Sequence, residues 1–179
     1  SNSGDKGSFT AGNLTAWDID YEKSHIKFTG EQAGAPFTGT WNAWKADLRF
    51  DSQQLKNSSF YVTVDTGSVY TNDAERDETI QSSEFFDIIN FPQAIFQSSD
   101  FSNDGDAFIA NAELIMKGIR QPISFHFKVN RVGNTITLEG DAQLVRHQWN
   151  IGTGDWADPT WVGSDVKVSV LVQATLGSL

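Results

Sequence analysis

The sequence predicts an all-β protein whose antiparallel strands close into a barrel of about eight strands. A short helical insertion is expected around residues 72–91. Apolar and polar residues alternate over long stretches from Thr15 onward, which is typical of strands with one buried face. Short turns containing Gly, Asn and Asp separate these stretches. A flat sheet of this size would leave one apolar face in water, so the sheet has to close on itself or fold over. A β-sandwich is the alternative architecture.

Length and composition restrict the classes of protein further. A chain of 179 residues fits one barrel domain, and 13 Phe and 6 Trp supply a core. The net charge of −10 disfavours nucleic acid as a partner, because phosphate contacts need clustered Lys and Arg. The chain has no Cys, which excludes disulfides and thiolate metal sites. No apolar run reaches 18 residues, so no integral membrane segment is expected.

The first residues differ in composition from the rest of the chain. Residues 1–14 begin with small polar residues, Gly and Ser, and are expected to form a flexible N-terminal linker. Residues 15–179 are expected to form the barrel domain. The alternation predicts strands over residues 15–21, 24–31, 41–50, 58–69, 94–101, 108–116, 123–129, 135–151 and 165–176.

The alternation stops between Asp65 and Ser98, where the pattern becomes helical. Asn72 and Glu75 have the spacing of a capping box, and the helix is expected to run to about Ser82. Phe85, Phe86 and Phe91 follow and are expected to fix the helix over one end of the barrel. Our hypothesis is that this segment closes or gates the interior.

The sequence contains no recognisable motif for catalysis or metal binding. The chain contains no Gly-x-Ser-x-Gly motif and no glycine-rich phosphate loop, and its three His are scattered over separate predicted strands. Residues 100–111 resemble a calcium loop only faintly, because Asn111 stands where that motif requires an acid. Asp155 and Asp158 flank Trp156 in a Gly-rich run that is more simply a loop. The sequence therefore predicts neither an enzyme nor a metal site.

The inward-facing positions of the predicted strands are the remaining candidates for function. A barrel of about eight strands is either filled by side chains or holds one apolar ligand. If the barrel holds a ligand in an interior tunnel, the residues expected to line that tunnel are Phe28, Trp44, Leu48, Phe60, Val62, Val64, Phe86, Phe96, Leu114, Met116, Phe125, Phe127, Leu144 and Trp149.

Three polar residues are candidates for a structural or head-group role: Arg146, Arg76 and Asp77. Arg146 is in phase with Leu144 and is expected to point inward. A buried Arg needs a partner. We expect pairing with an acid such as Asp77, ahead of contact with a polar ligand head.

Several motifs occur in a fixed order along the chain. They are Ser68-Val69, Thr71, Arg76-Asp77, Ile80, Ser83-x-Phe85-Phe86, Phe91-Pro92-x-Ala94, Leu114-x-Met116-x-Gly118-Ile119 and Arg146-x-x-Trp149-x-Ile151-Gly152. With these motifs the chain resembles, over roughly Trp17 to Ala174, the YceI-like proteins, a bacterial family of lipocalin-like barrels that bind polyisoprenoids.

The resemblance implies a non-catalytic carrier that holds the apolar tail of an isoprenoid lipid in the tunnel. The ligand would be an isoprenoid quinone such as ubiquinone, or a polyprenyl lipid, and no metal. The resemblance also implies a periplasmic or secreted protein. The alternative function is an interaction module with a filled core, part of a larger secreted multimodular protein, with Tyr61 and Trp161 as contacts. A homodimer and other modules of a longer chain are further partners that the sequence leaves open.

Overall fold

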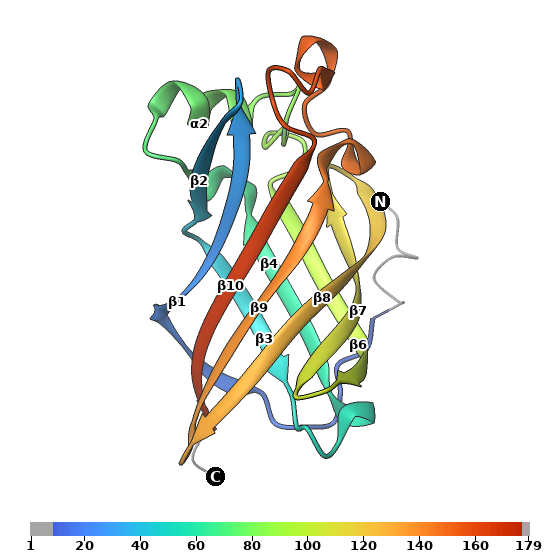
Figure 1. Cartoon of the computed structure of the whole chain (residues 1–179). Helices are drawn as coiled ribbons and strands as arrows, with labels where there is room; N and C mark the ends of the chain where they lie inside the picture. Colours follow the sequence, from blue (N-terminus) through green and yellow to red (C-terminus); the bar gives the residue numbers. More distant parts are fainter. Residues whose placement is uncertain (1–8, 177–179) are drawn as a thin grey trace.

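The computed structural model describes residues 9–176, which form one antiparallel sheet of ten strands (Figure 1). The strands are β1 (Trp17–Gln32), β2 (Ala35–Trp41), β3 (Trp44–Arg49), β4 (Ser59–Asp65), β5 (Val69–Tyr70), β6 (Gln93–Asp104), β7 (Ala107–Met116), β8 (Ile119–Val132), β9 (Thr135–Val145) and β10 (Asp165–Leu176). The helical elements are α2 (Ala74–Gln81) and the short 3-10 turns η1 (Leu55–Asn57), η2 (Thr66–Ser68), η3 (Arg146–Trp149) and η4 (Gly154–Ala157).

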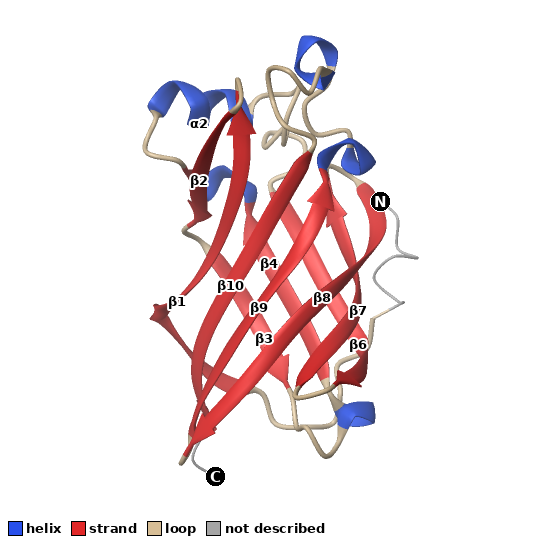
Figure 2. Cartoon of the chain, viewed as in Figure 1, coloured by secondary structure: helices blue, strands red, loops and turns tan. Residues whose placement is uncertain are grey.

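The sheet curls until its two ends meet, which gives the elongated barrel seen in Figure 2. Neighbouring strands follow the order β3-β4-β6-β7-β8-β9-β10-β1-β2-β5. The chain runs directly from β2 into β3, and from β4 through η2 into β5. The Asn42 N–H in the first link donates to the Ser68 carbonyl in the second at 3.2 Å. The predicted all-β barrel is confirmed. If β2 and β3 are counted as one bent strand, and β4 and β5 as another, the ten strands become eight.

Two of the predicted strand boundaries are wrong because the backbone is locally irregular. The stretches 15–21 and 24–31 belong to one strand, β1, whose register against β10 shifts between Asp20 and His25. The stretch 41–50 is two strands, because Asn42 and Ala43 interrupt it. Odd-numbered residues face inward before this interruption and even-numbered residues after it, so Trp41 and Trp44 both line the interior.

Two further predicted stretches end earlier than expected. The stretch predicted as one strand over 58–69 ends at Asp65, and η2 separates it from β5. The stretch predicted as one strand over 135–151 leaves the sheet at Val145, where η3 begins. In the N-terminal segment, residues 9–14 lie against the barrel. The Gly12 N–H donates to Ser59 Oγ at 2.8 Å, and Arg49 donates to the Gly12 and Leu14 carbonyls at 3.2 and 3.1 Å. Residues 1–8 of the predicted linker lie outside the described residues.

Helix α2 has the predicted extent but a different cap. Asp73 is the N-cap, and its carboxylate accepts a hydrogen bond from the Arg76 backbone N–H at 3.0 Å. Asn72 has a φ of 60°, a left-handed conformation that Asn tolerates better than most residues. The predicted Asn72–Glu75 capping box is therefore wrong. In the part of the chain that the structure describes, no helix is both long and apolar enough to span a membrane.

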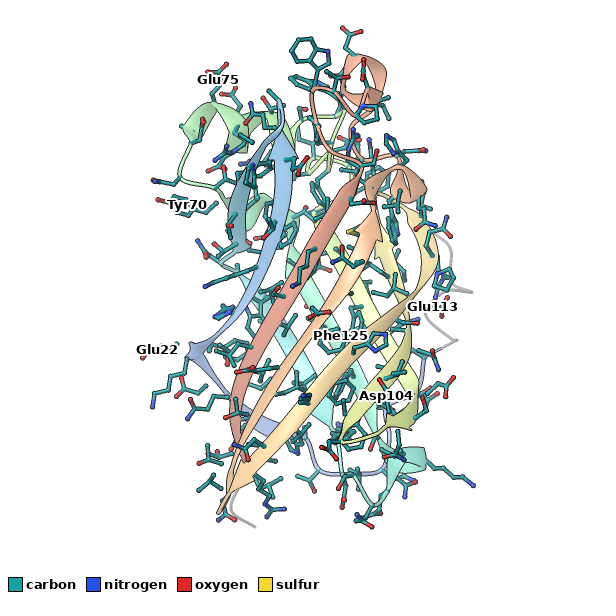
Figure 3. All side chains as sticks on the ribbon, in the orientation of Figure 1. Glu22, Tyr70, Glu75, Asp104, Glu113 and Phe125 are labelled. Atoms are coloured by element: carbon teal, nitrogen blue, oxygen red, sulfur yellow. The ribbon has the colours of Figure 1, made fainter. Side chains whose placement is uncertain are left out.

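Aromatic side chains fill the barrel at the end opposite α2, the lower end in Figure 1. We call this set the lower aromatic cluster: Phe50, Phe60, Phe101, Phe108 and Phe127. Ring centroids within it lie 4.9 to 6.2 Å apart, in the range of favourable aromatic pairs. Phe125 stacks on Phe127 with ring centroids 5.6 Å apart and lies near the middle of the barrel (Figure 3).

Candidate ligand-binding cavity

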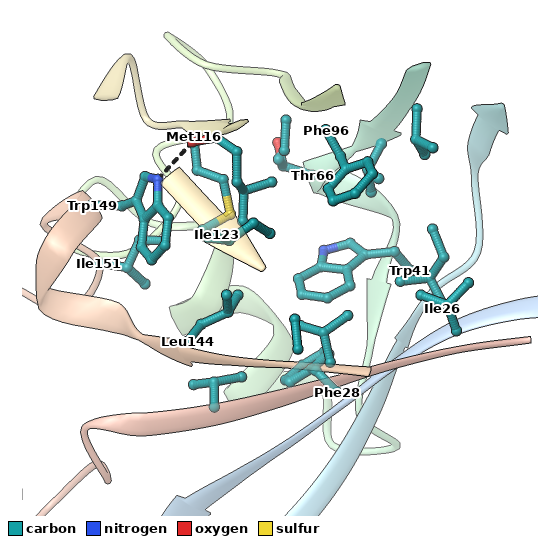
Figure 4. Close-up of a pocket in the computed structure, with 18 of the residues that line it drawn as sticks. Ile26, Phe28, Trp41, Thr66, Phe96, Met116, Ile123, Leu144, Trp149 and Ile151 are labelled. Carbon is teal, nitrogen blue, oxygen red and sulfur yellow. Dashed lines mark hydrogen bonds between the residues drawn. The ribbon is translucent and has the colours of Figure 1, made fainter. Parts of the chain in front are cut away.

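Above the lower aromatic cluster the barrel contains a cavity of about 190 Å³ that is lined almost wholly by apolar atoms (Figure 4). Phe60 is the one member of the cluster that lines it. Dry apolar cavities of about 150 Å³ bind molecules such as benzene. The cavity therefore accommodates an apolar group in its present shape, and a longer chain requires side chains to shift.

The structure places every residue predicted to line a tunnel at this cavity except Phe127. Phe127 is 2% exposed and packs inside the lower aromatic cluster. Its strand β8 crosses the barrel at an angle, so Phe125 faces the cavity and Phe127, two residues further, faces the filled end. Whether the lining residues contact a lipid stays a prediction.

Several lining residues were absent from the predicted set. On β10 they are Val166, Val168, Val170 and Val172, which the alternation in the sequence correctly places on one apolar face of the predicted strand. Phe37 and Trp41 on β2 were missed because the break after Trp41 carries no clear sequence signal. The others include Ile26, Ile80, Phe85, Ile123, Leu138, Ala142, Ile151 and Val162.

Irregular segments cover the upper end of the cavity. Ile80, Phe85 and Phe86 come from α2 and the turn after it, and Ile151 and Val162 come from the loop between η3 and β10. These two segments are joined, because the Glu84 carbonyl accepts hydrogen bonds from the N–H groups of Gly152 at 2.7 Å and Thr153 at 2.9 Å. The cover is thus one connected structure built from two distant parts of the sequence.

Arg146 organises the second of these segments. It is 3% exposed, and all five of its guanidinium N–H donors are used. They donate over 2.7 to 3.0 Å to the carbonyls of Gly163, Ile151, Gly152, Trp156 and Val162. Burial lowers the pKa of Arg146 below the usual value of a guanidinium. The guanidinium has no donor left for a ligand.

The expected pairing of Arg146 with Asp77 is wrong. Asp77 Oδ1 instead accepts hydrogen bonds from the Thr71 N–H at 2.8 Å and the Thr71 hydroxyl at 2.6 Å. A buried guanidinium was expected to need an acid, but backbone carbonyls of a loop satisfy it. Gly152 makes this arrangement possible, because a Cβ at that position would clash with Arg146 Nη1.

Arg76 and Asp77 both lie outside the cavity lining and fix α2 to the barrel. Arg76 donates to the Thr71 hydroxyl and carbonyl, both at 2.8 Å, and to Gln32 Oε1 at 3.2 Å. Its guanidinium carbon also lies 4.3 Å from the centroid of the Phe37 ring, in the geometry of a cation–π contact. Phe37 lines the cavity, so the contact links the outer network to the cavity wall.

Few polar atoms face the cavity. The Trp149 indole N–H donates to the Leu114 carbonyl at 2.9 Å, and the Thr66 hydroxyl donates to the Phe91 carbonyl at 3.0 Å. The Trp41 indole N–H is buried and has no acceptor among the described residues. Among residues 9–176, no group of three or more His, Cys, Asp and Glu side chains could hold a metal ion. The site is therefore suited to binding an apolar group.

Comparison with known proteins places this geometry in a family. The family model described as YceI-like domain matches residues 17–174. A UPF0312 protein of Yersinia pestis (strain Pestoides F) is 32% identical over 131 residues, which cover 70% of this chain and 68% of that protein. Protein YceI of Salmonella arizonae is 31% identical over 156 residues, 81% of this chain and 82% of that protein.

Solved structures agree with this assignment. The crystal structure of BcnA from Burkholderia cenocepacia superposes with a TM-score of 0.85 at 27% identity, covering 88% of this chain and all of that one. A polyisoprenoid binding domain from Saccharophagus degradans has a TM-score of 0.72 at 13% identity and covers 91% of this chain and 99% of that one, which demonstrates a shared fold. The match of the family model over nearly the whole barrel, together with these relatives, means that the chain belongs to the YceI-like domain family.

Proposed function

We propose that this protein is a non-catalytic carrier that holds the apolar tail of an isoprenoid lipid in the barrel cavity. The observation that supports the proposal most strongly is the cavity inside the barrel, lined almost wholly by apolar atoms, beside a packed lower end. One structural relative is described as a polyisoprenoid binding domain, in keeping with this ligand class. The ligand is an isoprenoid quinone such as ubiquinone or a polyprenyl lipid, and no metal takes part.

Physical chemistry supports an apolar tail as the source of affinity. Moving a methylene group from water into an apolar environment is worth about 0.8 kcal/mol, so a few isoprene units provide substantial binding energy without polar contacts. Part of this is offset by the entropy lost when a flexible tail is ordered and the protein and lipid associate. Binding should therefore strengthen with tail length until the cavity is filled.

The direct test is mass spectrometry of an organic extract of the purified protein, followed by uptake of an added isoprenoid quinone. We expect that a prenyl lipid co-purifies with the protein, or that the protein takes up the added quinone in a saturable manner. Protein that carries no prenyl lipid and takes up no quinone would contradict it.

Two matched variants test whether the quinone is taken up into the barrel cavity. Ala142 is buried and lines the cavity from β9, whereas its neighbour Gln143 is exposed on the outer face. Ala142→Leu fills part of the cavity and should weaken quinone uptake, and Gln143→Leu should leave it unchanged. Equal effects of the two substitutions would place the lipid elsewhere.

The alternative function is an interaction module with a filled core. The cavity of about 190 Å³ counts against a filled core. Its two expected contact residues also differ in exposure. Trp161 is 57% exposed, but Tyr61 is half-buried and packs against Phe9 with ring centroids 5.1 Å apart. We further propose a periplasmic or secreted location, as the family resemblance implies. Homodimerisation or linkage to other modules would be tested by sedimentation analysis and by the full gene sequence.

A further inference from the structure

Trp41 carries the unusual polar atom of the cavity. Its indole projects among the lining residues in Figure 4 and packs against Phe28 and Phe86, with ring centroids 4.5 and 5.8 Å apart. The indole nitrogen is buried, and no acceptor for its N–H exists among residues 9–176. Trp149 gives the contrast within the same cavity, because its N–H donates to the Leu114 carbonyl at 2.9 Å.

A buried donor without an acceptor is unusual, because buried polar groups are almost always paired in native proteins. The cavity wall offers no partner, since nearly all of its exposed atoms are carbon. A Phe at this position would keep the ring contacts without this unpaired donor. The N–H of Trp41 therefore points to an acceptor supplied by the bound molecule.

Charge restricts what that acceptor can be. An ionised phosphate inside an apolar cavity requires a cation or several donors, because burying an unpaired charge is very unfavourable. The cation at the cavity wall, Arg146, already donates all five of its N–H groups to backbone carbonyls. Arg76 lies outside the lining and is held by Thr71 and Gln32. A single neutral oxygen suits a single N–H donor.

We propose that Trp41 Nε1 donates a hydrogen bond to a neutral oxygen of the ligand, so that the head of the lipid lies inside the cavity beside Trp41. Among isoprenoid lipids this selects quinones, whose carbonyl oxygens accept without bringing a donor that needs its own partner. The flat quinone ring also matches the aromatic surroundings formed by Trp41, Phe28 and Phe86. Prenyl phosphates are disfavoured as ligands. This inference rests on the proposed function.

The test compares three probes of equal tail length: an isoprenoid benzoquinone, the corresponding prenyl hydrocarbon and the corresponding prenyl monophosphate. Each is titrated into the wild-type chain, Trp41→Phe and Trp44→Phe. Trp44 is the matched control, because it lines the same cavity but has no buried unpaired nitrogen. Trp41→Phe should weaken quinone binding by about 3- to 10-fold, the usual effect of one hydrogen bond, and leave hydrocarbon binding unchanged. Trp44→Phe should change the affinities for quinone and hydrocarbon by the same factor.

A spectroscopic readout on the wild-type chain avoids dependence on how well Trp41→Phe folds. The indole N–H resonance of Trp41 should move downfield with the quinone and remain in place with the hydrocarbon. Equal loss of quinone and hydrocarbon binding in Trp41→Phe, or tighter binding of the monophosphate than of the quinone, would overturn the inference. Failure of the wild-type chain to bind any probe would instead overturn the proposed function and this inference with it.

Discussion

The two ends of the barrel are built from the same strands but in different ways. At the lower end, rings from five strands or adjoining turns pack directly on one another, and the interior is filled. At the upper end, the interior holds a cavity, and its cover consists of irregular segments joined by hydrogen bonds. Tightly packed apolar side chains resist opening, because separating them would leave voids. A cover held by separate polar contacts can instead open locally.

One sheet thus combines a tightly packed end with an end that holds a cavity. The lower aromatic cluster stabilises the barrel, and of its members only Phe60 also lines the cavity. The upper end contains a cavity in place of packed side chains, and hydrogen bonds from Arg146 and Arg76 hold its cover in position. Substitutions at the lower end should therefore change stability, and substitutions at the upper end should change ligand exchange.

The largest effect is expected for Phe127→Ala at the lower end. Phe127 is 2% exposed and contacts the rings of Phe50, Phe60 and Phe108. Removing a buried Phe ring costs about 3–5 kcal/mol of unfolding free energy. Urea unfolding should show this loss, while quinone affinity of the folded variant stays unchanged. Phe85→Ala in the upper cover is the comparison, and an equal loss of stability there would contradict the contrast between the ends.

The second effect concerns Arg146→Met, which leaves five backbone carbonyls without their donor. We expect the free energy of unfolding to fall by about 2–4 kcal/mol, because buried carbonyl acceptors lose their hydrogen bonds to a charged donor. Hydrogen exchange should accelerate over residues 146–163 before it does in β8 or β9. Arg131→Met, an exposed position, serves as the control and should change stability by less than about 0.5 kcal/mol. Uniform acceleration through the barrel would contradict a local role of Arg146.

A smaller effect is expected for Arg76→Met, which removes the contacts of α2 with Thr71, Gln32 and the Phe37 ring. The expected cost is about 1 kcal/mol, since the site is partly exposed. If α2 gates the cavity, quinone release measured by stopped-flow fluorescence should become faster while equilibrium stability changes little. An unchanged release rate would show that the lipid does not pass α2.

The smallest effect concerns pH and a residue at neither end. Burial, with a further contribution from nearby Lys27, lowers the pKa of His25 on β1. The folded chain therefore resists protonation of His25 more than the unfolded chain does. Its contribution to stability is fully present above the ordinary histidine pKa of about 6.5 and is lost as pH falls through the lowered pKa of the folded state. His25→Gln should reduce the fall in stability between pH 7 and pH 5, and an identical pH profile would contradict this.

The sequence predicted the regular parts of this molecule well. Residues 165–176 form β10 with the expected bounds, and the alternation of Trp44, Ala46 and Leu48 was correctly read as one inward face. These positions were predictable because a strand with one buried face imposes a period of two on its residues.

The parts that were not predicted depend on contacts between distant segments. The break at residues 42–43 reverses the inward face, which hid Trp41. Arg146 was correctly expected to be buried, but its acceptors come from a loop whose path the sequence does not indicate. Phe125 and Phe127 face the same side of β8, so the alternation in the sequence does not distinguish them. Only their positions along the barrel do, because Phe125 reaches the cavity and Phe127 the filled lower end.

The central claim is that the lipid tail lies inside the barrel beside the inward face of β10. The most direct measurement uses an isoprenoid quinone with a photoactivatable diazirine on its tail, bound, irradiated and mapped by mass spectrometry. Val166, Val168 and Val170 face the cavity, while the interleaved Lys167 lies exposed on the outer face. We expect cross-links to these valines and their loss on competition with unlabelled quinone. Cross-links at Lys167 and other outward positions, insensitive to competition, would contradict it.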